Sequence, residues 1–460
     1  MVPHKSLLAV VALLGATVSA SGVSGTAFGF ATGTTGGGSA SPASPSDTAQ
    51  LTEWLSDSTP RVILIDKEFN YLGTSGKCTD CKCCIPDSNT CGSSGQNAID
   101  LDSSSWCGSY PTTTCTYDKA AIEGIEVASN KSIVGVGSAG VIRGKGLRLV
   151  NGVSNVIIQN IHITELNPQF IWGGDAITLD GTNNIWIDHV KISLIVSTME
   201  TTEKTCIDLS SCGNVTISNC EFDGQTSWSA SCDGHHYWTV YLHDSLGYGK
   251  NDKVTFTGNY IHHTSGRSPK LEFNSYWHAY NNYWFNNTGH AFDVGSGTKA
   301  LIEGNVFHNV DTPLLTDSSP GKTLAVGSND KSTCDSKLGR TCVANTLVSS
   351  GALSASDESV LSSWPSSELG VSVTSSASQV RSSVLSNAGV GQLSSSSKRQ
   401  FDGAPNLPIL SAAGPGATPA SAPQRWTWRT VGVKPAAQAS SAPSAKSGEA
   451  PTSGLFGIGF

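Results

Sequence analysis

Lys253-Val-Thr-Phe-Thr-Gly-Asn259 is one copy of a pattern that recurs at a fixed interval along the chain. The same pattern returns in Tyr276-Trp-His-Ala-Tyr-Asn-Asn282 and in Lys299-Ala-Leu-Ile-Glu-Gly-Asn305. Each copy predicts a strand of about five residues in which side chains alternate between two faces. The final asparagines are 23 residues apart (282 − 259 and 305 − 282). One short strand and one turn in every two dozen residues indicate a solenoid.

Three earlier segments continue the repeat, at Asn155–Asn160, Asn184–His189 and Asn214–Asn219. Asparagine suits a turn column because it tolerates a left-handed backbone, and its amide can bond the equivalent asparagine of the next coil. We therefore expect an all-β fold, a right-handed single-stranded parallel β-helix with long loops. A β-sandwich or propeller is the alternative, and the equal spacing of single strands disfavours it.

The two ends of the chain differ in composition from this repetitive part. Residues 1–20 combine Lys5, an apolar run from Leu7 to Ala16 and small residues up to Ala20, the pattern of a secretory signal peptide. We expect one folded domain at 21–393, followed by a disordered tail rich in Ser, Ala and Pro at 394–460. With this signal pattern, and with no later run of the length of a membrane span, the chain is expected to be secreted.

The 13 cysteines favour an oxidising compartment, and seven of them lie between Cys78 and Cys115. The count is odd, so one thiol is expected to remain unpaired within the chain. Zinc binding by Cys78-x-x-Cys81 and Cys83-Cys84 is the alternative interpretation. Export also makes Asn130, Asn214 and Asn286, each in an Asn-x-Ser/Thr triplet, candidate glycosylation sites.

The charge pattern argues against nucleic acid as a partner. The formal net charge is −8 and there is no long basic run, whereas nucleic-acid binding rests on neutralising phosphates with Lys and Arg. The glycine-rich segment Gly29–Gly38 is superficially similar to a phosphate loop, but it lacks the Gly-Lys-Ser/Thr ending. A nucleotide site is therefore not expected.

Two cations stand three residues apart in the turn Thr264-Ser-Gly-Arg267-Ser-Pro-Lys270. This turn lies close after the aromatic run His235-His-Tyr-Trp238. Cations beside aromatic walls suit a substrate that is anionic or that develops negative charge during reaction.

Together with seven other segments, this turn and the motif that ends in the aromatic run resemble the fungal pectin lyases, in the polysaccharide lyase family that also includes the pectate lyases. The segments are Gly29–Gly38, Asn130–Gly135, Trp172–Asp180, Trp186–His189, Cys232–Trp238, Thr264–Lys270, His278–Trp284, Gly289–Phe292 and Glu303–Phe307. The resemblance covers roughly residues 29–393 and implies the same parallel β-helix.

The resemblance implies β-elimination on methyl-esterified (1→4)-α-D-galacturonan, giving 4,5-unsaturated oligosaccharides in plant cell-wall degradation. It makes Arg267 the residue that abstracts the C5 proton, Lys270 a binding residue in the cleft and Asp175 the third member of the site. Arginine ordinarily has a pKa near 12.5, so its use as a base requires a high pH or neighbouring cations and burial.

Calcium separates the two activities of this family. Abstraction beside a free carboxylate builds a second negative charge, which pectate lyases offset with calcium, whereas a methyl ester carries no charge. At the positions of the calcium ligands only Asp175 and Asp208 are acidic, and Lys204 stands at another. We therefore expect no metal and no cofactor. If Glu203 rather than Lys204 faces the cleft, a calcium-dependent pectate lyase is the alternative.

Five aromatic residues match positions that line the pectin lyase cleft: Trp106, Tyr110, Trp172, Tyr237 and Trp238. With Lys204 they are our expected substrate-binding residues, since flat rings suit esterified sugars. The resemblance also implies a disulfide between Cys334 and Cys342, and one between Cys232 and Cys83 or Cys84.

The expected partner is pectin. We expect the protein to be a monomer that binds neither nucleic acid nor a membrane. A third hypothesis is a secreted pectin-binding protein without catalysis. Hydrolysis is disfavoured, because no suitably placed carboxylate pair is present.

Overall fold

The computed structural model describes residues 22–393, apart from 102–105, 196, 203–212, 244–251, 273, 317–319, 365–370, 372 and 375. The expected signal peptide at 1–20 and the expected tail at 394–460 lie outside the described residues. Within the described part, no helix is both long and apolar enough to cross a membrane.

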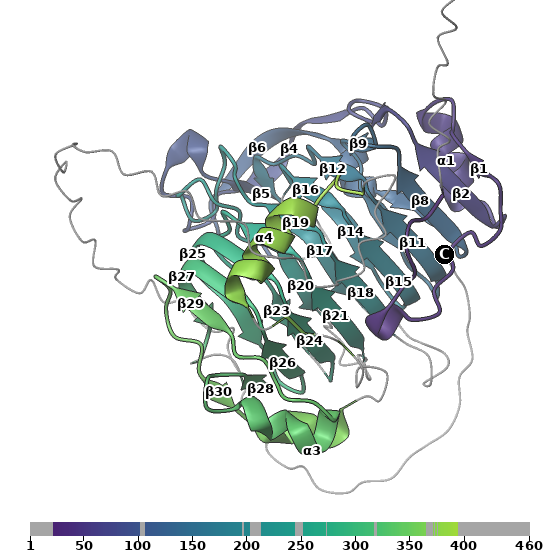
Figure 1. The fold of residues 1–460 in the computed structure, drawn as a ribbon. Helices are drawn as coiled ribbons and strands as arrows, with labels where there is room; N and C mark the ends of the chain where they lie inside the picture. The colour runs from purple at the N-terminus through teal and green to yellow at the C-terminus, as the bar shows by residue number, and fades with distance from the viewer. Residues whose placement is uncertain are drawn as a thin grey trace, which may run out of the picture. The chain divides into compact units, whose positions relative to one another are not determined.

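The six strands expected from the repeat are confirmed, and they are consecutive neighbours in one parallel sheet, sheet 1 (Figure 1). Their bounds are β11 (Ser154–Gln159), β15 (Asn183–Asp188), β18 (Asn214–Ser218), β21 (Lys253–Thr257), β24 (Tyr276–Tyr280) and β26 (Lys299–Glu303). Sheet 1 is extended by β1 (Pro42–Ala43), β2 (Arg61–Ile65), β8 (Lys131–Gly135), β28 (Lys322–Ala325) and β30 (Ala355–Ser356). The architecture is a right-handed parallel β-helix.

Two further faces complete each coil. Sheet 2 contains β3 (Glu68–Asn70), β9 (Val141–Arg143), β12 (His162–Thr164), β16 (Lys191–Ser193), β19 (Glu221–Asp223), β22 (Tyr260–His262), β27 (Val306–Leu314) and β29 (Thr346–Val348). Sheet 3 contains β7 (Ile125–Glu126), β10 (Leu147–Leu149), β14 (Asp175–Leu179), β17 (Ser197–Thr202), β20 (Val240–His243) and β23 (Lys270–Leu271). The long strand β25 (Tyr283–Val294) joins both sheets, pairing with β22 and with β23. Most of these strands have only two or three residues. An alternating pattern cannot be recognised over so few residues, so the sequence did not predict these strands.

A small fourth sheet and several helices surround the coils. Sheet 4 consists of β4 (Lys77–Cys84), β5 (Asn97–Ile99), β6 (Thr112–Asp118) and β13 (Phe170–Ile171). The helix α1 (Thr48–Ser56) buries Leu51 and Leu55 in the main core. The helix α4 (Ala377–Asn387) packs Val380 and Val384 on the outer side of sheet 2 (Figure 1). The short helices are α2 (Lys119–Glu123) and α3 (Asp335–Leu338).

The core runs through the inside of the coils as stacked columns of apolar side chains. One column crosses sheet 1 in register and contains Ile133, Ile158, Ile187, Ile217, Phe256, Ala279 and Ile302, none more than 2% exposed. Burying a side chain such as isoleucine stabilises a fold by about 1.5–3 kcal/mol. Because every coil adds one residue to the column, the coils stabilise one another.

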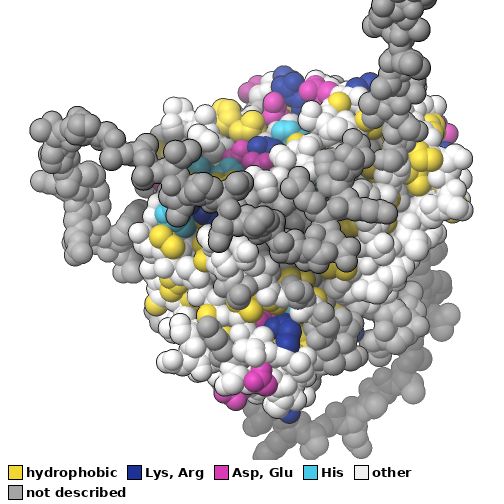
Figure 2. All heavy atoms as spheres, viewed as in Figure 1, with side chains coloured by type: hydrophobic (Ala, Val, Ile, Leu, Met, Phe, Trp, Pro, Cys, Tyr) yellow, Lys and Arg dark blue, Asp and Glu magenta, His cyan; other side chains and the backbone are white. Residues whose placement is uncertain are grey.

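The charged side chains on the face in Figure 2 lie in small groups of mixed sign. A mixed-sign group on sheet 2 joins Lys191 to Glu221 and Asp223, with Nζ at 2.9 Å and 3.3 Å from their carboxylate oxygens. The described side chains on this face therefore form no large patch of a single sign.

The expected asparagine ladder is confirmed. The backbone N–H and the Nδ2 of Asn259 both donate to Oδ1 of Asn282 at 3.0 Å, and Asn282 donates in the same way to Asn305 at 2.9 Å. Asn305 continues the ladder to Asn345. All three asparagines of the repeat are fully buried.

The left-handed backbone falls one residue earlier than expected. Positive φ angles occur at Gly258 (68°), Asn281 (54°) and Gly304 (62°), and the ladder asparagines after them have ordinary angles. The left-handed residue turns the chain at the end of the strand. The side chain of the asparagine after it points inward and reaches the neighbouring coil. The left-handed backbone and the hydrogen bond to the next coil therefore belong to two adjacent residues, whereas the sequence led us to expect both at one asparagine.

We predict that Asn282→Ala lowers the free energy of unfolding by about 3 kcal/mol or more, because it leaves the donors of Asn259 buried without an acceptor. The measurement is chemical unfolding followed by circular dichroism. Asn387→Ala is the control, since Asn387 is exposed on α4 and its side chain bonds only Ser383. Equal stability of the two variants would contradict a structural role for the ladder.

Candidate active site

The outward face of sheet 3 carries a row of polar side chains. On β10, Leu147 and Leu149 enter the core, so Arg148 between them faces outward. Arg148 is opposite Thr178, and the same row continues through β17 and β20 to Lys270 and Asp293. A ligand that lies across the strands of sheet 3 would therefore meet successive coils.

Arg267 lies between β22 and β23, in a left-handed conformation with φ of 48°. Its N–H donates to Nε2 of His290 at 3.0 Å, and its carbonyl accepts from the N–H of Val240 at 2.9 Å. The guanidinium carbon lies 5.8 Å from the ring centroid of Tyr237, within the range of a cation–π contact. A left-handed arginine is sterically unfavourable and persists where its surroundings hold it.

His290 is the acceptor that holds the main chain of Arg267, a role that the sequence did not indicate. Burial lowers the pKa of His290 to about 4; the carboxylate of Asp293 opposes this shift, whereas the cations Arg267 and Lys270 add to it. The ring is therefore neutral above that pH, with its proton on Nδ1 and a free lone pair on Nε2. A protonated ring could not accept the hydrogen bond from Arg267.

Lys270 is the first residue of β23, three positions after Arg267. Its Nζ lies 3.2 Å from Oε1 of Glu272 and 3.5 Å from Oδ2 of Asp293. The two carboxylates hold the ammonium group over the sheet and partly balance its charge.

Asp175 is the first residue of β14 and is partly buried. It lines a pocket of about 180 Å³ together with Trp172, Arg148 and Thr178. The preceding glycines are required sterically, because a Cβ on Gly174 would lie 2.2 Å from the carbonyl oxygen of Ala121. Three strand spacings separate β14 from β23, about 14 Å at the usual 4.8 Å.

The five expected aromatic residues come together. Trp106, Tyr110, Trp172, Tyr237 and Trp238 all pack, partly buried, against one small apolar cluster. Trp106 contacts the rings of Tyr110 and Trp172, with centroids 5.5 Å and 6.0 Å away, and Tyr237 contacts Trp238 at 5.0 Å. The cluster includes Tyr237, the ring beneath Arg267.

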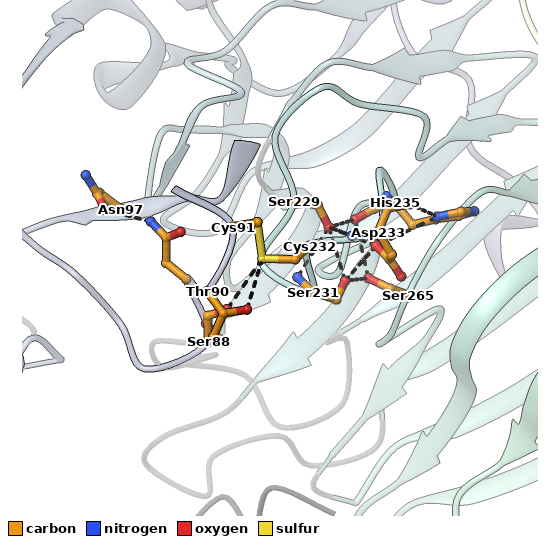
Figure 3. Close-up of a disulfide and its surroundings, with 11 residues drawn as sticks. Ser88, Thr90, Cys91, Asn97, Ser229, Ser231, Cys232, Asp233, His235 and Ser265 are labelled. Carbon is orange, nitrogen blue, oxygen red and sulfur yellow. Dashed lines mark hydrogen bonds and ion pairs between the residues drawn. A yellow bond between two sulfur atoms is a disulfide. The ribbon is translucent and has the colours of Figure 1, made fainter. Parts of the chain in front are cut away.

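Asp233 organises the loop that carries Tyr237 and Trp238 (Figure 3). Its carboxylate accepts hydrogen bonds from the hydroxyls of Ser229, Ser231 and Thr288 at 2.9, 3.0 and 2.5 Å. Burial raises the pKa of Asp233, but these hydrogen bonds outweigh burial and leave the pKa below its ordinary value. The hydroxyl oxygens of Ser231 and Ser265 lie 2.5 Å apart, and Ser265 is two residues before Arg267. Asp233 lies in the motif Cys232–Trp238. From this motif the sequence analysis names only Cys232 and the aromatic run as candidates, so it misses the role of Asp233.

The expected partner of Cys232 was wrong. The structure joins Cys232 to Cys91, whereas Cys83 pairs with Cys115 and Cys84 with Cys107 inside sheet 4. Cys83 and Cys84 are fully buried between β4 and its neighbours, while Cys91 lies in the loop that reaches the Asp233 segment (Figure 3). The disulfide anchors that segment to the region of sheet 4.

The remaining described cysteines complete the pattern. Cys78 pairs with Cys81 and Cys334 with Cys342, the latter as the resemblance implies. All four cysteines considered for zinc are thus in disulfides, so none of these four offers a thiolate to a metal. Cys220 is free and buried, and burial raises the pKa of its thiol.

Lys204, Glu203 and Asp208 lie outside the described residues, so the charge opposite Asp175 stays a prediction. Among the described residues one group of potential metal ligands comes together, Glu221, Asp223 and His262. It lies on sheet 2, away from Asp175, and Lys191 already pairs with both carboxylates.

The side chains of two candidate glycosylation sites, at the starts of strands of sheet 1, are hydrogen-bonded to the neighbouring coil. Asn130 accepts from Nδ2 of Asn155, and Nδ2 of Asn214 donates to Asn183 at 3.0 Å. Asn286 is partly exposed in β25. Glycosylation at the three sites stays a prediction.

We predict that His290 titrates with a pKa of about 4 in the folded protein, against an ordinary value of 6.5. The neutral ring is the form that the fold favours, so its contribution to stability is complete above pH 6.5 and declines as the pH falls towards 4. Histidine-selective NMR checks this, with His290→Gln to assign the signal. A pKa near 6.5 for this ring would contradict the assigned hydrogen bond.

Comparison with known proteins identifies the family. A family model described as pectate lyase matches residues 87–393. Probable pectin lyase F of Aspergillus niger is 65% identical over 463 aligned positions, covering 96% of this chain and 95% of that protein. Pectin lyase D of Aspergillus niger is 46% identical over 394 positions, covering 85% of this chain and all of that protein.

Solved structures agree on the fold. A pectate lyase bound to a hexasaccharide superposes with a TM-score of 0.52 at 18% identity, covering 82% of this chain and 100% of that one. A pectate lyase from Bacillus sp. N165 in complex with trigalacturonate gives 0.51 at 19% identity, covering 80% and 99%. The chain belongs to the pectate lyase family, within which its relatives of nearly full length bear the name pectin lyase.

Proposed function

We propose that this chain is a pectin lyase, a polysaccharide lyase that cleaves methyl-esterified galacturonan by β-elimination and so degrades pectin in plant cell walls. One observation carries the proposal. Five aromatic side chains pack against one apolar cluster, and one of them, Tyr237, lies beneath the guanidinium of Arg267. Apolar walls around a cationic turn suit a neutral, esterified sugar better than a fully ionised one. The names of the relatives agree.

In the proposed reaction, the side chain of Arg267 in its neutral form takes the proton from C5 of a galacturonate ring. The electron pair of that C–H bond forms the C4–C5 double bond, and the bond from C4 to the glycosidic oxygen breaks. The oxygen leaves with its electron pair and takes up a proton. Lys270 stabilises the negative charge that develops on the C6 carbonyl oxygen. Because Glu272 and Asp293 hold Lys270, its ammonium is already oriented before the substrate arrives.

Asp175 has a separate role in this proposal. It lies about three strands from Lys270 and beside Trp172 in the pocket, so it contacts a neighbouring part of the polymer.

We propose that the protein acts outside the cell as a monomer on pectin. Five disulfides within the described residues support an oxidising compartment. The expected signal peptide at 1–20, glycosylation of Asn130, Asn214 and Asn286, and the disordered tail at 394–460 complete the proposal.

We expect unsaturated product, followed by its ultraviolet absorbance, from highly methylated pectin and at an equal rate with calcium or with chelator. Arg267→Ala should abolish this product, because it removes the base. Arg143→Ala is the control, since Arg143 lies on sheet 2 and pairs with Glu165.

The same assay separates the alternatives. Product from polygalacturonate that chelator abolishes would replace the proposal with a calcium-dependent pectate lyase. Pectin binding with no product from either polymer would leave the non-catalytic hypothesis.

A further inference from the structure

Arg148 differs from the other described arginines, because the structure records no ion pair, hydrogen bond or ring contact for its guanidinium. Arg61, Arg143 and Arg340 pair with carboxylates, and Arg267 and Arg381 lie over aromatic rings. Arg148 is nevertheless partly buried. A cation in such a position normally has a partner.

The stem of Arg148 is held in place. It lies over Gly124, where an added Cβ would come within 2.7 Å of its Cγ and Cδ. Gly124 has a positive φ of 62°, so the backbone at this position also favours glycine. The methylene groups are therefore packed, and Arg148 lines the pocket that Asp175 and Trp172 also line.

Trp172 supplies an independent indication of a ligand at this pocket. Its indole Nε1 is buried without a hydrogen-bond partner among the described residues. Its φ is 64°, a left-handed conformation that is rare for a bulky residue and that clusters at binding sites. Arg148 and Trp172 thus offer hydrogen-bond donors that lack acceptors, and the acceptor they fit is an anion or a carbonyl oxygen.

We infer that Arg148 anchors a distal subsite that binds a free carboxylate of partly methyl-esterified galacturonan. This inference rests on the proposed function. The planar fork of arginine fits a carboxylate with two parallel hydrogen bonds, and such charge-assisted bonds are stronger than bonds to a neutral ester. Lys270 differs, because Glu272 and Asp293 already pair with its ammonium and partly balance its charge.

The register of sheet 3 gives the distance of this subsite from the reaction. Arg148 and Lys270 occupy the same row, four strands apart along β10, β14, β17, β20 and β23. At about 4.8 Å for each strand, the two positions are roughly 19 Å apart. A polymer that contacts both must cross the coils, so Arg148 meets a ring several residues from the cleaved bond. It therefore affects affinity and the pattern of products, not the chemical step.

The test compares wild type, Arg148→Gln and Arg143→Gln on fully methylated pectin and on the same pectin after partial random de-esterification. We expect Arg148→Gln to raise KM about tenfold on the partly de-esterified polymer, with kcat within about twofold and KM on the fully methylated polymer unchanged. Arg143→Gln removes the same charge on sheet 2 and should match wild type, since exposed ion pairs contribute little.

A binding arm needs no catalysis. In the Arg267→Ala background, calorimetry with hexagalacturonate and with its full methyl ester should show that Arg148→Gln weakens only the first. Equal losses for both ligands would overturn the carboxylate assignment, and no loss for either would overturn the subsite. If wild type yields no unsaturated product, the proposed function fails, while the binding arm still decides the role of Arg148.

Discussion

The amide ladder between successive coils is the interaction on which the rest of this structure depends. Parallel strands of two to six residues cannot be stable alone, so each coil needs its neighbours for backbone hydrogen bonds and for burial. At Asn282 and Asn305, one side-chain oxygen accepts hydrogen bonds from two donors of the preceding coil. These hydrogen bonds set the spacing between successive coils at the turn. The apolar columns fill the interior of the coils.

The candidate site uses the rigidity that this stacking provides. The coils place Asp175 and Lys270 on one face, and the loops between strands bring the remaining groups to them. Arg267 is held in an unfavourable conformation by His290 on the next coil and by Val240 on the preceding one. Asp233 and the disulfide from Cys91 to Cys232 then fix the aromatic loop. Strained and loop-borne groups thus obtain precise positions from a repetitive frame.

The charges of the site follow from the same arrangement. Lys270 has two carboxylate partners, whereas Arg148 has none among the described residues. Cations in one row of a sheet can therefore have different roles, one beside the cleaved bond and one that recognises the polymer at a distance. The sequence positions alone, 148 and 270, give no sign that the two lie in one row.

By itself, the sequence determined the solenoid, the six strands of sheet 1 and the asparagine ladder, because the same residue pattern recurs at a regular spacing in successive coils. It also determined the turn that holds Arg267 and the set of five aromatic residues, which the motifs contain. Only the tertiary structure decided the two- and three-residue strands, the partner of Cys232, the contact of His290 with Arg267 and the lack of a partner for Arg148 among the described residues. These features depend on which loops come together in the fold. Short strands and long loops have no repeating residue pattern from which their contacts could be predicted.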